Sequence, residues 1–64
     1  MNERRMKADL LRVDAFRYRI NHQMNQAEFS AKCGLSRPHY TLIENGVRIP
    51  SDKTMKKIRN AMED

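Results

Sequence analysis

Residues 25–46 read NQAEFSAKCGLSRPHYTLIENG, and the spacing within this stretch decides the fold. Gly34 stands eight residues after Gln26 and twelve before Gly46. Because glycine enters the left-handed conformation at a helix C-terminus without steric cost, Gly34 is expected to end one short helix. The Asn45-Gly46 pair is a second helix stop. The spacing therefore predicts two short helices joined by a tight turn, a unit that can present its second helix to the major groove of DNA.

The predicted helix starts carry capping signals. Asn25 can accept a hydrogen bond from an amide of the first turn, and Glu28 follows three residues later in a capping-box-like arrangement. Ser36 is the expected cap of the second helix. Pro38 lies in the first turn of that helix, where amides have no partner inside the helix, so its missing donor costs little. These signals predict one helix from Asn25 and a second over residues 37–44.

Upstream of this unit, helical periodicity extends from about Lys7 to His22. A stripe with spacings of four, three and four runs along one face and comprises Leu11, Ala15, Tyr18 and His22. Phe16 and Ile20 are apolar beside this stripe, so the pattern leaves the rotation of the helix open by one residue. Gln23 follows, so either it takes the left-handed conformation or the helix ends without one.

Downstream, Pro50 and a Ser51 cap predict a last helix from about Asp52 to Met62. Its apolar positions, spaced by three and four, are Met55, Ile58 and Met62. Strand-like alternation is absent. The chain is therefore predicted to be all-α, a compact bundle of four or five short helices. We expect a single domain over residues 1–64, in which residues 1–7 form a basic N-terminal arm.

Composition narrows the possible functions. A chain of 64 residues buries only about 60% of its unfolded surface, which leaves little room for an enzyme cleft, and no catalytic nucleophile and base are recognised. The net charge of +5 favours an anionic partner, and nucleic acid is favoured over a membrane because no segment is apolar enough to insert. Cys33 is the only cysteine and no signal peptide is evident, so we expect a cytoplasmic, nucleoid-associated protein. No cofactor, metal or small-molecule ligand is expected.

Residues 26–50 resemble the helix-turn-helix of the phage Cro and repressor family, also called the XRE family. The motifs that carry this resemblance are Asn-Gln-Ala-Glu, Gly-Leu-Ser-Arg and Ile-Glu-Asn-Gly, and the resemblance covers about residues 11–62. The resemblance implies a lambda-repressor-like fold and a sequence-specific regulator of transcription that binds double-stranded DNA. It favours a Cro-type repressor from a phage or mobile element that occupies a palindromic operator. The alternative is a protein-binding adaptor or antitoxin with the same fold.

The resemblance also implies residue roles in DNA binding. Candidates for reading bases are Arg37, Pro38, His39, Thr41 and Leu42. Candidates for phosphate contacts are Asn25, Gln26, Arg48, Lys53, Arg4 and Arg5. Arg37 can donate two hydrogen bonds to a guanine, a contact that discriminates by about 1–3 kcal/mol, or it can clamp a phosphate instead. A helix N-terminus at Gln26 also favours an anion on physical grounds.

Other residues are expected to support the scaffold. The resemblance implies an ion pair between Arg19 and Glu44, with Gly34 as the structural turn. The spacing of Tyr40 with Ile43 favours a core role over stacking on DNA. Cys33 stands where the family usually has an aliphatic residue, and the resemblance therefore implies an inert buried thiol.

Because family members usually bind as symmetric dimers, a weak homodimer is expected. Met55 or Met62, together with Ile49 or Val47, are the candidates for its contact, and a plain core role is the alternative for these residues. His22 and His39 lack a second metal ligand at workable spacing.

Overall fold

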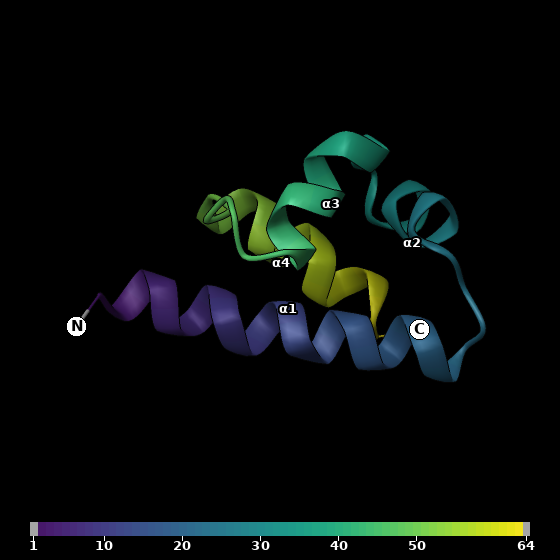
Figure 1. Ribbon diagram of the computed structural model, residues 1–64, viewed down its shortest axis with the longest axis horizontal. Helices are drawn as coiled ribbons and strands as arrows, with labels where there is room; N and C mark the ends of the chain where they lie inside the picture. Colours follow the sequence, from purple (N-terminus) through teal and green to yellow (C-terminus); the bar gives the residue numbers. More distant parts are fainter. Residues whose placement is uncertain (1, 64) are drawn as a thin grey trace.

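A computed structural model describes residues 2–63, and the chain forms four α-helices in this range with no strand. They are α1 (Glu3–Asn21), α2 (Gln26–Cys33), α3 (Arg37–Glu44) and α4 (Asp52–Ala61). The long helix α1 lies along one side of the molecule, and the three shorter helices pack together on its other side (Figure 1). The predicted all-α bundle is confirmed, and α3 has the bounds that the cap and stop signals predict.

α1 begins earlier than the sequence pattern indicated. Asn2 caps the helix because its side-chain oxygen accepts hydrogen bonds from the amides of Arg4 and Arg5. Residues 3–7, which were expected in a basic N-terminal arm, are therefore the first turns of α1 rather than an arm, and the helix begins at Glu3 instead of near Lys7. Met1 lies outside the described residues. The cap at Asn2 was not predicted because the apolar stripe that marked this helix in the sequence begins only at Leu11.

α1 ends through a residue that is not glycine. His22 is its C-cap, and Gln23 takes a positive φ of 56°, one of the two outcomes that the sequence left open. The Met24 amide then donates to the Arg19 carbonyl at 2.8 Å. This bond satisfies a carbonyl of the last turn and turns the chain toward α2.

One core joins all four helices. Its buried apolar side chains are Ala8, Leu11, Ala15, Phe29, Cys33, Tyr40, Ile43, Met55, Ile58 and Ala61. The Phe29 ring lies between two aromatic neighbours, with its centroid 5.3 Å from Tyr40 in an edge contact and 5.6 Å from Tyr18. Tyr40 and Cys33 are thus core residues, as their spacing predicts.

The two faces of α1 settle the rotation of this helix. Leu11 and Ala15 face the core, whereas Phe16 and Ile20 are 46% and 51% exposed. The stripe identified in the sequence is therefore the inner face. His22, the last member of that stripe, is exposed and stacks on the Tyr18 ring with centroids 3.9 Å apart.

The residues expected in a dimer contact are distributed differently. Met55 is only 1% exposed and belongs to the core, which is the second of the two roles that the sequence left open. It is buried because it occupies the inner face of α4 together with Ile58. Met62 and Ile49 are half-buried against the core, and Val47 is 72% exposed. Most of the exposed large apolar side chains lie on the outer face of α1.

Candidate nucleic-acid interface

The N-terminus of α2 is closed by a reciprocal cap. The Asn25 side chain accepts from the Glu28 amide at 2.7 Å, and the Glu28 carboxylate accepts from the Asn25 amide at 2.9 Å. This is the capping box that the sequence predicts. Gln26 is consequently the first helical residue, and its side chain is directed toward α3 by the contacts described below.

The turn between α2 and α3 depends on Gly34. Its φ of 73° is left-handed, and the Leu35 amide donates back to the Ser30 carbonyl at 2.9 Å. Ser36 then caps α3 by accepting from the His39 amide at 3.3 Å. Ser30 is buried at the crowded inner face, where its hydroxyl donates to the Gln26 carbonyl at 2.7 Å. The turn therefore fixes where α3 begins relative to α2.

α3 presents two different faces. Tyr40 and Ile43 are each 1% exposed and anchor its inner face. Of the five residues predicted to read bases, Arg37, Pro38 and Leu42 are exposed, whereas His39 and Thr41 are half-buried. Arg37 makes no side-chain ion pair or hydrogen bond within residues 2–63, so its guanidinium has all five donors available for a partner.

A buried polar network fixes the C-terminal end of α3. The Arg19 guanidinium donates to both oxygens of the Glu44 carboxylate, through Nη2 at 2.7 Å and Nε at 3.2 Å. Both side chains are nearly buried, with 11% and 7% exposed. The Gln26 Nε2 atom donates to the same carboxylate at 3.3 Å, and the Thr41 hydroxyl donates to Gln26 Oε1 at 3.0 Å. The predicted ion pair is thus part of a chain of contacts that links α1, α2 and α3.

The network shifts the proton affinities of its members. Burial by itself raises the pKa of Glu44, but the hydrogen bonds and positive charge of Arg19, with help from Gln26, bring that pKa below its ordinary value. The carboxylate in turn raises the pKa of Arg19. Burial, followed by the nearby Glu44 carboxylate, raises the pKa of Tyr40, whose hydroxyl finds no hydrogen bond of ordinary geometry within residues 2–63. The pair is therefore charged at neutral pH.

The loop between α3 and α4 is held by arginines of α1. Arg5 donates from Nη2 to the Gly46 carbonyl at 2.9 Å, and Arg12 donates to the Glu44 carbonyl at 3.4 Å. Gly46 has a φ of 78°, and a Cβ atom there would lie 3.1 Å from the Arg12 guanidinium carbon. The backbone of the loop is thus packed against basic side chains. The contact of Arg12 with this loop was not predicted from the sequence, although Arg5, Arg12 and Arg19 recur every seven residues on one side of the helix.

The predicted phosphate-contact residues divide into two groups. Arg48 and Lys53 are exposed and make no side-chain hydrogen bond or ion pair within residues 2–63. Arg4 instead pairs with Asp52 at 3.3 Å, and Arg5 holds the loop. Of the six predicted contacts, Arg48 and Lys53 are thus available, whereas the side chains of Asn25, Gln26, Arg4 and Arg5 already have partners within the chain.

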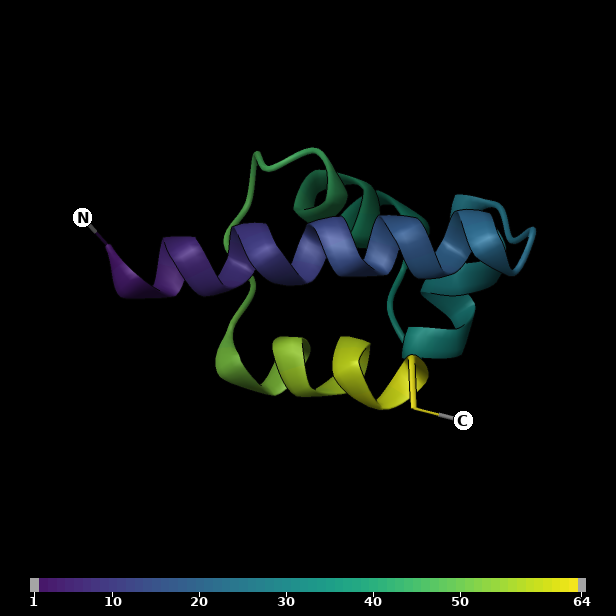
Figure 2. The ribbon, with the colours of Figure 1, turned by 90° about the horizontal axis from the view of Figure 1, so that it is seen from below.

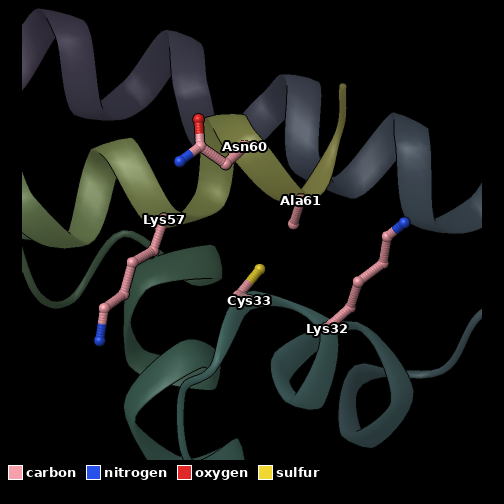
Figure 3. Close-up of a pocket in the computed structure, with 5 residues that line it drawn as sticks. All are labelled: Lys32, Cys33, Lys57, Asn60 and Ala61. Atoms are coloured by element: carbon pink, nitrogen blue, oxygen red, sulfur yellow. The ribbon is translucent and has the colours of Figure 1, made fainter. Parts of the chain in front are cut away.

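A separate surface hollow lies between the end of α2 and the end of α4. Its lining residues are Lys32, Cys33, Lys57, Asn60 and Ala61. Figure 3 shows the two lysine side chains pointing away from the Cys33 sulfur, which lies near Ala61. Burial raises the pKa of the Cys33 thiol to about 11, so the thiol stays protonated at neutral pH. Residues 2–63 hold no group of three or more His, Cys, Asp or Glu side chains placed to bind a metal.

With this geometry established, comparison with known proteins identifies the class. A family model described as Helix-turn-helix matches residues 17–63, and the chain belongs to this XRE-type helix-turn-helix family. The family consists of DNA-binding regulators, which are generally not enzymes. No curated protein and no solved structure shows a significant match to the chain. Within the described residues, no helix combines the length and the apolar character needed to cross a membrane.

Proposed function

We propose that this chain is a Cro-type repressor that occupies a palindromic operator as a weak dimer and blocks transcription. The observation that carries the proposal is the contrast along α3. Its inner face is fixed by the core and by the Glu44 network, while Arg37, Pro38 and Leu42 stand exposed on the outer face. A rigid helix with free side chains at its N-terminal end suits recognition of base edges in a major groove.

Base reading is assigned first to Arg37. Its free guanidinium can donate two parallel hydrogen bonds to guanine O6 and N7, which no other candidate on α3 can do. Pro38 and Leu42 offer only apolar contact, suited to a thymine methyl group. Thr41 already donates its hydroxyl proton to Gln26, so it can only accept a hydrogen bond while that contact persists, and His39 keeps a ring nitrogen for a base or phosphate.

Phosphate contacts are assigned to the ends of α2 and α4. Gln26 and Asn25 stand at the α2 N-terminus, where unpaired amides and the helix dipole favour an anion. Arg48 and Lys53 add free positive charge from the loop and from the first turn of α4. Arg4 and Arg5 can add charge only if DNA displaces their contacts with Asp52 and the loop.

Selection from random duplexes tests this function. We expect wild-type protein to enrich one palindromic motif, and Arg37→Ala to lose preference at one position of each half-site at a cost of about 1–3 kcal/mol in affinity. Arg48→Ala is the matched control, because loss of a phosphate contact weakens all sequences alike. It should reduce the slope of log affinity against log salt by about 0.9. Equal loss on every sequence for Arg37→Ala would reassign Arg37 to phosphate.

A second function is favoured by one specific observation. Leu42 and Val47 are 40% and 72% exposed, and the Val47 amide donates to the Leu42 carbonyl at 2.9 Å, so two large apolar side chains lie beside the candidate DNA face. Such a patch suits an adaptor or antitoxin that docks another protein. Selection that enriches no motif above the salt-sensitive background would favour this function over the repressor.

A further inference from the structure

The outer face of α1 carries a second apolar stripe that the core does not use. Its members are Met6, Leu10, Val13, Phe16 and Ile20, each between 40% and 64% exposed. Spacings of four, three, three and four place them on one side of the helix, opposite the buried Leu11 and Ala15. Their exposed surface amounts to roughly 400 Å² per copy, a size at which a patch on a monomer is often functional.

The stripe is symmetric about Val13. Leu10 and Phe16 lie three residues to either side of it, and Met6 and Ile20 lie seven residues to either side. When two copies of α1 lie antiparallel about a two-fold axis at Val13, Leu10 comes level with Phe16 of the second copy. Met6 likewise comes level with Ile20 of the second copy. Every layer of the contact is then filled by apolar side chains from both copies.

Charges at the edge of the stripe favour the same arrangement. Asp9 and Arg17 each lie four residues from Val13, on opposite sides, so the antiparallel pairing brings Asp9 of one copy level with Arg17 of the other. Arg17 makes no ion pair within residues 2–63. The Asp9 carboxylate already pairs with Arg5 at 3.5 Å and with Arg12 at 3.0 Å in its own helix, but its side chain remains 41% exposed, so Arg17 of the second copy would add to this cluster. A parallel pairing would instead set the two Arg17 side chains opposite each other. Antiparallel helix dipoles add to this preference.

The position of α3 is compatible with this pairing. Figure 2 shows α1 foremost, with α3 above it and α4 below it, so the outer face of α1 is turned away from both. Arg12 reaches α3 on one flank, and Leu10 borders Arg59 of α4 on the other. A two-fold axis perpendicular to α1 and in the plane of that view keeps each copy's α3 on the same side. Both recognition helices then lie on the same side of the dimer.

We infer that the outer face of α1 is the homodimer interface, formed by antiparallel contact of Met6, Leu10, Val13, Phe16 and Ile20 with a second copy of the chain. The role of this dimer in operator binding rests on the proposed function, whereas the existence of the dimer does not. The area of roughly 400 Å² per copy is about half that of a standard interface, so the dimer is weak and forms at high concentration or on DNA.

Sedimentation equilibrium of the full chain without DNA, from micromolar to millimolar concentration, tests the interface. Wild-type protein should dimerise, and Val13→Glu should raise the dissociation constant at least about tenfold because two carboxylates meet on the axis. Ala31→Glu is the matched control, since it places the same charge on an exposed site of α2, and it should leave dimerisation unchanged. Thermal melts check that both variants fold.

Charge exchange tests the antiparallel register. Arg17→Asp alone should weaken the dimer, and adding Asp9→Arg to the same chain should restore it. Thermal melts of the double variant check that it folds without the Asp9 pairs to Arg5 and Arg12. Wild-type protein that stays monomeric throughout, or Val13→Glu that dimerises as well as wild type, would overturn the inference. Monomeric wild-type protein that pellets with anionic lipid vesicles, when Val13→Glu does not, would also overturn the inference. That result would assign the stripe to a membrane surface. Half-site DNA binding by Val13→Glu, measured separately, reports on the proposed function independently of the dimer.

Discussion

The two ends of α3 contrast sharply in how many contacts they make. At the C-terminal end, the Glu44 carboxylate accepts hydrogen bonds from Arg19 and Gln26 and is nearly buried. At the N-terminal end, Arg37 is exposed and makes no side-chain hydrogen bond or ion pair within residues 2–63. The difference separates two tasks, since one end fixes the orientation of the helix and the other leaves side chains available for a partner. Substitutions at the first end should therefore change stability, and those at the second should change recognition.

The largest stability effect is expected at Ile43. Ile43→Ala should lower the free energy of unfolding by about 2–5 kcal/mol, because it leaves a cavity in a core shared by all four helices. The neighbouring Leu42→Ala, on the exposed face of the same helix, should change it by no more than about 0.5 kcal/mol. Urea titrations of both variants make the measurement. Equal losses for the two would mean that α3 does not have the inner and outer faces described.

Glu44→Ala should have the next largest effect. It leaves the nearly buried Arg19 guanidinium without its carboxylate partner, which should cost about 1–3 kcal/mol. For a domain of this size, each kcal/mol corresponds to a fall in melting temperature of about 4–8 °C. Glu63→Ala, which removes an exposed carboxylate, is the control. An unchanged melting temperature for Glu44→Ala would show that the ion pair does not anchor α3.

Acid should weaken the same end of α3 by a smaller amount. Because the folded state lowers the pKa of Glu44, its contribution to stability is present above the ordinary glutamate pKa of about 4.3 and is lost as the pH falls through the lower folded value. Glu44→Gln should therefore lose less stability than wild type between neutral pH and strongly acidic pH. Denaturant titrations at several pH values give the free energy of unfolding as a function of pH. The same pH dependence for the two proteins would show that Glu44 is not the group whose protonation weakens the fold.

The smallest stability effect is expected at the free end of the helix. Arg37→Ala should shift the free energy of unfolding by no more than about 0.5 kcal/mol, since the side chain is exposed and holds no other residue. Its melting curve should coincide with that of wild type even where operator affinity falls. A clear loss of stability would mean that Arg37 supports the scaffold, and the contrast between the two ends would then fail.

Local signals explain why so much of the fold was predictable. The caps at Asn25, Ser36 and Ser51 and the glycine at position 34 each act on backbone groups a few residues away, and all four are observed. The start of α1 was mispredicted because Asn2 is an equally local cap, but the apolar stripe that marked the helix in the sequence begins only at Leu11. The role of Met55 stayed open in the sequence because a helical stripe shows that a residue faces a partner, but not whether that partner is the core or a second chain.

The candidate site was predictable as a set of residues but not as a set of contacts. Arg37 and Arg48 could be placed near the recognition helix from their positions in the sequence. That Arg4 and Arg5 are engaged with Asp52 and Gly46 could not, because those partners lie more than forty residues away along the chain. Which arginines are free for DNA depends on how the first turns of α1 pack against the loop before α4.

By itself, the sequence determined the helix-turn-helix, because caps, a left-handed glycine and apolar spacing act over one or two turns of a helix. The family resemblance added the pairing of Arg19 with Glu44. Only the tertiary structure decided that Gln26 bridges Glu44 and Thr41, and that three arginines of α1 hold the end of α3 and the loop after it. It also decided that the apolar stripe through Val13 is left on the surface. These outcomes depend on the relative rotation of packed helices, which side-chain packing sets and spacing along one helix does not.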